Sequence, residues 1–389
     1  MEKLRSKWVI LVISCMLMMC FALTLQALPP LFELMKKDIS FTNSQAGMLM
    51  GVYAIPGIFL PFFIPVILKR FSIEKLIIFA LAIMVLGQIA FSLANTFGLL
   101  LLFRLFVGTG STMVVVLAPL LVTMSFDKDN MGKAMGIFNT AVPLGSVIAA
   151  NAFSFLGLMM GWRWIMVFIA LYVAFVFVLI MINISPSVNS VKETDEGNRT
   201  KSSKRSVYLL GLIWTLANAL MIAYMSFGAQ YYQEKGMSQN FASFLTSMIM
   251  LLSIFLSPIM GILFDKTGKK RIFLIVGNGI IGISFLSILF IGKALPLWAV
   301  LIGVGYATIP VYVFSVLSEV MDPSEMGMGL SILTVASNLG VTLGPIIVGF
   351  LLDVFKGSFF VVFMTFTLYS VSVLVISLFV KEKDASSFL

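Results

Sequence analysis

Arg104 is the residue in this sequence whose type and surroundings most directly suggest chemistry. It lies inside the apolar run 97–124, about seven residues from one end, which is roughly 10 Å deep if the run is helical. A charge at that depth costs up to about 3 kcal/mol, so something should compensate it. Two interpretations stay open: Arg104 contacts an anionic solute or a proton pathway, or it is a structural arginine that bonds helix carbonyls or reaches the interface.

Uncharged polar side chains inside other apolar runs could orient a bound solute through hydrogen bonds. Together with Arg104 they form the substrate-binding set that the sequence predicts: Gln26, Tyr53, Asn139, Asn218, Tyr224, Tyr306, Tyr312 and Asn338. Each of them could instead make an interhelical hydrogen bond worth about 0.6 kcal/mol. Both roles therefore stay open for every member of the set.

Carboxylates that could hold a proton at depth are nearly absent. Glu33, Glu234, Glu319 and Asp353 fall at the ends of apolar runs, and the chain has no histidine. A proton that crosses a membrane has to be held and released on the way, so proton or cation exchange is disfavoured. Glu33 or Asp353 could still act as a gate at the outer end. An Arg104 that faces inward without a buried acid favours an anionic solute.

Other chemistries are disfavoured by what the chain lacks. Cys15 and Cys20 lie in one apolar run on different helical faces, so we expect neither a disulfide nor a metal site. No nucleophile–base pair, metal-ligand spacing or phosphate-binding Gly-x-x-x-x-Gly-Lys loop appears. We therefore expect no enzymatic activity, no cofactor and no ATP-driven pumping.

The elements that would position these residues are membrane helices. Hydrophobic residues make up 60% of the chain and charged residues 11%, whereas soluble domains are about half apolar and a quarter charged. The apolar runs are continuous and about 20 residues long, as helices require and barrel strands do not. We predict an all-α integral membrane protein with transmembrane helices over 8–28, 45–68, 74–95, 97–124, 134–158, 163–184, 207–231, 241–263, 272–292, 296–319, 329–353 and 358–380.

The distribution of Lys and Arg predicts how the chain crosses the membrane. Basic residues gather in alternate loops, which places both termini and the polar segment 185–206 in the cytoplasm. The same loops account for the net charge of +9, so we expect no nucleic-acid partner. We predict a multi-pass protein of the plasma (inner) membrane, with an N-terminal six-helix bundle over 1–184, a cytoplasmic linker over 185–206 and a C-terminal six-helix bundle over 207–389.

The two halves of the chain carry related motifs. The turn Gly261-Ile-Leu-Phe-Asp265-Lys266-Thr-Gly268-Lys269-Lys270-Arg271 has a degenerate copy that begins 196 residues earlier, at Pro65. The segments 131–141 and 326–336 match at an offset of 195. Six spans in each half make the two halves parallel repeats, in a 6+6 pseudo-twofold arrangement. In such proteins a solute site is expected near the midplane, where the repeats meet.

These motifs resemble those of the major facilitator superfamily of secondary transporters, over essentially the whole chain. The turn at 261–271, the span-four pattern Leu102-Phe-Arg104-Leu-Phe-Val-Gly108-Thr-Gly110 and the sequence Gly161-Trp162-Arg163-Trp164 carry the resemblance. It implies that the basic turns stabilise one conformation of the transport cycle. The conformational gating residues would be Gly261, Asp265, Lys266, Gly268, Lys269, Lys69 and Arg70.

The sequence also departs from the family pattern. Lys69 and Ser72 stand where the family usually has Asp and Gly. This departure puts in doubt the cytoplasmic contact that the first turn usually makes in the family. The fifth span has Pro143-Leu-Gly145 where drug-exporting antiporters commonly carry a Gly-Pro pair. The eleventh span does have such a pair, Gly344-Pro345, with Gly340 and Gly349 on either side. These small residues could serve close helix packing.

The expected function is secondary active transport by alternating access, with a small organic anion such as a carboxylate as the solute. The alternative is an efflux antiporter for multiple drugs or lipophilic compounds. A transport-dead membrane sensor or scaffold is the third hypothesis. The expected partners are a small-molecule substrate, the lipid bilayer and a coupling proton or an exchanged anion. We expect a monomer.

Overall fold

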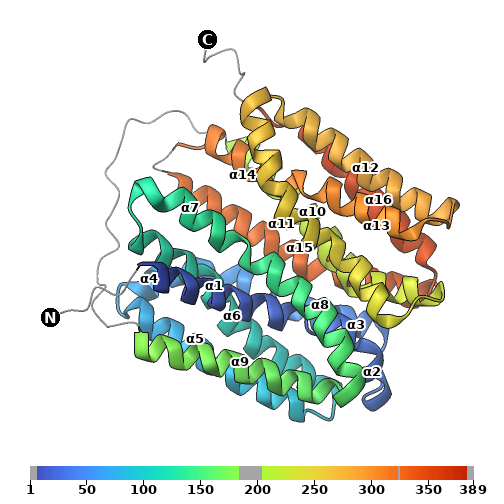
Figure 1. The fold of residues 1–389 in the computed structure, drawn as a ribbon, viewed down its shortest axis with the longest axis horizontal. Helices are drawn as coiled ribbons and strands as arrows, with labels where there is room; N and C mark the ends of the chain where they lie inside the picture. Colours follow the sequence, from blue (N-terminus) through green and yellow to red (C-terminus); the bar gives the residue numbers. More distant parts are fainter. Residues whose placement is uncertain (1–6, 184–203, 323–324, 383–389) are drawn as a thin grey trace. The chain divides into compact units, whose positions relative to one another are not determined.

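The computed structural model describes residues 7–183, 204–322 and 325–382, and the regular elements in these residues are helices (Figure 1). Those of the first half are α1 (Lys7–Gln26), η1 (Pro29–Leu31), α2 (Phe32–Asp38), α3 (Asn43–Val52), α4 (Pro56–Leu68), α5 (Ile73–Leu93), α6 (Phe97–Ser125), α7 (Lys128–Asn139), α8 (Ala141–Met160) and α9 (Trp162–Asn183). Those of the second half are α10 (Lys204–Glu234), α11 (Gln239–Thr267), α12 (Lys270–Phe290), α13 (Leu295–Tyr306), α14 (Thr308–Val320), α15 (Met326–Val354) and α16 (Phe359–Ser377).

Twelve helical stretches in the described residues are long and apolar enough to cross a membrane. Each overlaps one of the spans expected from the sequence, which confirms the all-α fold with twelve transmembrane helices. The predicted linker 185–206 lies largely outside the described residues. Its last residues, from Lys204 on, belong to α10, and its role as a cytoplasmic linker stays a prediction. Four of the spans consist of consecutive helices separated by a break: Lys7–Asp38, Asn43–Leu68, Asn130–Met160 and Leu295–Val320.

Prolines account for these breaks. A proline has no backbone N–H, so the carbonyl four residues earlier loses its helical partner. Pro29 follows the end of α1, Pro56 opens α4, Pro143 lies in the first turn of α8 and Pro310 in the first turn of α14. Pro345, by contrast, lies inside the continuous helix α15. The breaks leave polar carbonyls inside apolar segments, where other donors have to satisfy them.

The chain forms two compact units. Within the described residues, the first comprises 7–41, 48–183 and 238–243, and the second comprises 42–47, 204–237, 244–322 and 325–382. In the first unit α5 packs on α6 and α9, and α1 packs on α6 and α8 (Figure 1). In the second, α10 packs on α15, and α12 on α13 and α16.

Small residues allow the close packing of α15 on α10. A methyl group at Gly340 would overlap the carbonyl of Thr215, and one at Gly344 would overlap the carbonyl of Ala219. The Thr215 hydroxyl also donates to the Ala336 carbonyl at 2.9 Å. The predicted role of these glycines in close helix packing is therefore confirmed within the second unit.

Candidate functional site

Arg104 lies on α6 and is 1% exposed. Its guanidinium group donates to three backbone carbonyls: from Nε to Leu49 at 3.1 Å, from one terminal nitrogen to Thr24 at 2.7 Å and from the other to Leu25 at 3.0 Å. In the part of the chain that the structure describes, no carboxylate pairs with it. Arg104 is thus a buried cation that is compensated by peptide dipoles instead of an acid.

The three carbonyls lie at the ends of two interrupted helices. Thr24 and Leu25 lie in the last turn of α1, and the nitrogen that would normally bond the Leu25 carbonyl belongs to Pro29. Leu49 lies in the last turn of α3. A cation is favourable at a helix C-terminus, and here one side chain caps two of them. In the structural interpretation, Arg104 therefore stabilises the C-terminal ends of α1 and α3.

Tyr53 completes this arrangement from the break between α3 and α4. Its ring centroid lies 4.4 Å from the guanidinium carbon of Arg104, in cation–π geometry. Its hydroxyl is hydrogen-bonded to the Ser111 hydroxyl and lies 2.6 Å from the Thr24 hydroxyl oxygen, which in turn donates to the Cys20 carbonyl at 2.7 Å. We call the group Thr24, Leu25, Leu49, Tyr53, Arg104 and Ser111 the Arg104 cluster.

Gly108 explains how α6 comes close enough to form the Arg104 cluster. It lies one helical turn after Arg104, and a methyl group there would overlap the carbonyl of Tyr53 and lie 2.9 Å from its Cα atom. The spacing of Arg104 and Gly108 puts a long donor and a gap on one face of the helix. The span-four pattern that the sequence shows is thereby explained by packing within the first unit.

Gln26 is the predicted site residue whose polar group remains unsatisfied. It is 2% exposed, and its amide nitrogen has no hydrogen-bond partner among the described residues. Ala22, one turn earlier, approaches Gly145 of α8, which indicates that this side of α1 faces α8. A buried donor without a partner costs about 1–3 kcal/mol, so Gln26 is a candidate to donate to a bound solute.

The predicted asparagines lie apart from the Arg104 cluster. Asn218 and Asn338 each donate to a carbonyl one turn back on their own helix, at 2.7 and 2.8 Å. Asn139 is exposed at the end of α7, beside the break before α8. The structure does not bring these three together, and their part in solute binding stays a prediction.

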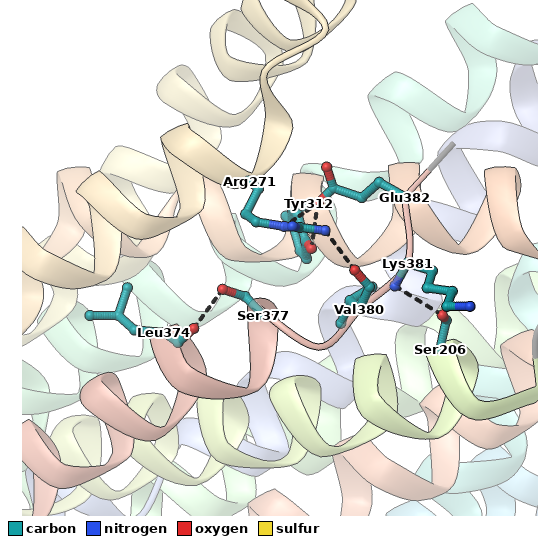
Figure 2. Close-up of polar contacts among 8 residues, drawn as sticks. All are labelled: Ser206, Arg271, Tyr312, Leu374, Ser377, Val380, Lys381 and Glu382. Carbon is teal, nitrogen blue, oxygen red and sulfur yellow. Dashed lines mark hydrogen bonds and ion pairs between the residues drawn. The ribbon is translucent and has the colours of Figure 1, made fainter. Parts of the chain in front are cut away.

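The predicted tyrosines of the second unit also have separate surroundings. The Tyr224 and Tyr232 hydroxyls are 2.8 Å apart, and Tyr224 packs against the Phe285 ring. Tyr306 is buried at the end of α13. Tyr312 is fully buried and donates from its hydroxyl to Glu382 at 2.7 Å (Figure 2). Their roles as solute contacts likewise stay predictions.

The two basic turns differ in backbone geometry. Gly268 has a φ of 64°, which side chains rarely adopt, whereas Ser72 at the equivalent position has a φ of −70°. The departure from glycine at Ser72 is therefore explained, because the first turn does not need it. The remaining gating candidates are exposed, apart from the half-buried Gly261: Asp265, Lys266, Lys269, Lys69 and Arg70. Their gating role stays a prediction.

The two carboxylates that the sequence offers as gates differ in their contacts. Glu33 pairs at 3.3 Å with Lys36, which lies one turn away on α2. Asp353 accepts backbone hydrogen bonds from Asn43 at 3.0 Å and Ser44 at 2.7 Å within the second unit, and so caps the start of α3. Glu33 thus forms a local ion pair, and Asp353 stabilises a helix start. A gating role for either carboxylate stays a prediction.

Glu74 is a buried carboxylate that was overlooked in the sequence, because it opens the predicted span 74–95. It is 4% exposed, and neither carboxylate oxygen has a hydrogen-bond partner in the described part of the chain. At the repeat offset of 196 it corresponds to Lys270, which pairs with Glu319 at the end of α14. The reversed charge at equivalent positions was the signal that could have identified Glu74.

Known proteins share this architecture. The family model described as Major Facilitator Superfamily matches residues 14–233 and 209–388. The lysosomal dipeptide transporter of Homo sapiens is 21% identical, with 87% of this chain and 79% of that protein covered. A probable sphingolipid transporter of Arabidopsis thaliana, a spinster homologue, is 26% identical over 38% of this chain and 30% of its own length.

A solved structure gives the same result for the fold. The crystal structure of a bacterial homologue of the human lysosomal transporter Spinster, in an inward-facing and unoccupied conformation, matches with a TM-score of 0.75. The match covers 96% of this chain and 94% of that one at 16% sequence identity. At this identity the match shows the fold, and the solute has to be argued from the residues of this chain.

Proposed function

The chain belongs to the Major Facilitator Superfamily, and on this premise we propose that it is a secondary active transporter that moves a small organic anion by alternating access. Interrupted helices commonly mark the binding regions of secondary transporters, because they expose helix ends and backbone groups inside the membrane. The ends of α1 and α3 meet such a description, and Arg104 holds both. Its charge is the single observation that carries the proposal.

The electrostatic argument concerns the balance of charge inside the first unit. Arg104 is buried, and the described residues offer it no acidic partner, so its field stays positive where side chains are screened from water. The unsatisfied amide of Gln26, which follows Leu25, would donate to the solute directly. A solute that carries a carboxylate fits both features, and a dipeptide, the substrate class of the human relative, is one such solute.

Uptake into proteoliposomes tests this proposal with three matched probes: alanyl-alanine, its N-acetyl derivative and its C-terminal amide. We expect saturable uptake of the two probes with a carboxylate, and at least about tenfold slower uptake of the amide, because a lost charged hydrogen bond is worth 1.5–3 kcal/mol. Empty liposomes serve as the control. Equal uptake of all three would contradict an anion site, and repeating the series with an imposed proton gradient decides whether transport is proton-coupled.

Export of lipophilic compounds is the alternative, and the similarity to a probable sphingolipid transporter favours it. The proteoliposomes that fail to take up any carboxylate would be loaded with a fluorescent sphingosine analogue. Protein-dependent transfer of that analogue, together with indifference to the dipeptides, would replace the anion proposal. In either case the Lys and Arg distribution supports a multi-pass protein of the plasma (inner) membrane with cytoplasmic termini.

Gln26→Leu is expected to raise KM for the N-acetyl dipeptide about tenfold, because it removes the unsatisfied donor that the solute would use. The same change should leave thermal stability equal or slightly higher, since it removes a buried group without a partner. Gln88→Leu is the matched control, because that amide already donates to the Met166 sulfur at 3.0 Å. An unchanged KM in Gln26→Leu would remove Gln26 from the site.

A further inference from the structure

The chain continues past α16 and crosses back over the ends of other helices of the second unit. Here the Val380 carbonyl accepts from a terminal nitrogen of Arg271 at 2.6 Å, and the Lys381 backbone nitrogen donates to the Ser206 hydroxyl at 3.1 Å (Figure 2). One carboxylate oxygen of Glu382 accepts from Arg271 Nε at 3.2 Å and from the Tyr312 hydroxyl at 2.7 Å. We call Val380–Glu382 the C-terminal clasp.

The C-terminal clasp connects three helices through buried and partly buried groups. Ser206 lies on α10, Arg271 on α12 and Tyr312 on α14. Ser206, Tyr312 and Val380 are buried, and the side chains of Arg271 and Glu382 are 32% and 19% exposed. A partly buried ion pair of this kind is screened less than a fully exposed one. The clasp is therefore a built contact of the second unit and not a loose tail on its surface.

The helix that the clasp holds, α14, is only half of a span. It is separated from α13 at Ala307, where Pro310 leaves the Tyr306 carbonyl without a helical donor. Lys270 of α12 forms an ion pair with Glu319 near the end of α14. Its neighbour Arg271 reaches Tyr312, about two turns earlier on α14, through Glu382.

Both halves of this span bury apolar residues, and α14 is held by polar side-chain contacts as well. In α13, a methyl group at Gly303 would meet the Met248 backbone, and one at Gly305 would overlap the Gly277 carbonyl, so this half is fixed by backbone contact. The half-helix α14 also buries an apolar face, which includes Val313, Val316 and Leu317. In addition, it is linked to α12 and the clasp by hydrogen bonds and ion pairs of side chains, and Phe314 packs on the Trp214 ring. Polar contacts can be exchanged for water, whereas close backbone packing cannot.

We propose that the C-terminal clasp is a latch for α14, and that this half-helix moves about Ala307 when the latch opens. Glu382 is its central group, because one carboxylate bonds both the helix that moves and the helix that holds it. The inference is independent of the transported solute. It assigns a conformational role to Arg271, the last residue of the motif turn.

Hydrogen exchange of the full chain in lipid nanodiscs tests the latch. Glu382→Gln and Tyr312→Phe should each speed amide exchange in 308–320 about tenfold, with 295–306 unchanged. The double variant should match the larger single effect, because both changes act through one carboxylate. Asp127→Asn is the control, since it removes the Lys7–Asp127 ion pair of the first unit.

Three results would overturn the latch. Unchanged exchange in 308–320 would mean that the clasp does not hold α14. Equal acceleration in 295–306 and 308–320 would mean that the clasp only supports the second unit as a whole. The same acceleration in Asp127→Asn would make the effect unspecific. A truncated variant that ends at Phe379 removes the whole clasp and is a stronger test if it folds. If it does not fold, the point substitutions are sufficient.

Discussion

Arg104→Ala is expected to lower stability by at least about 3 kcal/mol, and thus to prevent accumulation of folded protein rather than only to impair transport. The change removes the side-chain donors of the Thr24, Leu25 and Leu49 carbonyls, and each buried group that is left without a partner costs about 1–3 kcal/mol. Net stabilities of proteins are about 5–15 kcal/mol, so such a loss is a large share. Thermal unfolding in detergent, together with the yield of monodisperse protein, measures the effect.

Two further substitutions separate capping from charge. Arg104→Lys keeps the charge but cannot reach the ends of two helices with one ammonium group, so we expect only partial recovery. Arg163→Ala is the matched control, because Arg163 also donates to carbonyls, of Ser92 at 2.7 Å and Ala94 at 2.9 Å, with a third of its side chain exposed. Water can replace those bonds, and we expect a loss of about 1 kcal/mol.

The result distinguishes the two interpretations that the sequence left open. If Arg104→Ala folds with wild-type stability and loses only the uptake of anionic dipeptides, the capping account is wrong and Arg104 is a solute contact. If the protein fails to fold while Arg104→Lys folds and still prefers the anionic probes, the charge matters in addition to the caps. Uptake by Arg104→Lys therefore tests the anion proposal without depending on the alanine variant.

The fold could be predicted because its cause is local. Each span is a continuous apolar run, and the helix is the element that satisfies its own backbone in lipid. The breaks have a local cause too, since Pro56, Pro143 and Pro310 each remove a backbone donor near one of them. The effect of Pro29 on α1 was not predicted. It depends on which helix supplies the missing donor, and that is a tertiary fact.

The candidate site was predicted less completely for the same reason. Arg104 and Tyr53 were both selected from the sequence, and the structure joins them at 4.4 Å. The capping of two helix ends by Arg104, with the Tyr53 ring against its guanidinium group, could not be read from residues that are distant along the chain. Glu74 was overlooked because a residue at the end of a span was assumed to face water, whereas its burial depends on the packing of α5.

Gly344→Ala is expected to destabilise the second unit by about 3 kcal/mol, because overpacking of a tight interface forces backbone shifts. The added methyl group would overlap the Ala219 carbonyl and lie 2.6 Å from the Ala219 Cα atom. These are backbone atoms, so no rotamer change can relieve the contact. Thermal unfolding that is followed separately in the two units, by hydrogen exchange of their peptides, should show the loss in α10 and α15 first.

Gly279→Ala on α12 is the matched control with the opposite sign. Nothing lies within 4 Å of the added methyl group, so the substitution only removes the flexibility of glycine inside a helix and should stabilise by about 0.5–1 kcal/mol. The double variant Gly344→Ala with Ala219→Gly should not recover, because the contact is with the backbone and not with the Ala219 side chain. Recovery in that variant would show that α10 and α15 can shift apart at low cost. In that case, the close approach of the α15 and α10 backbones would not require the small residues of α15.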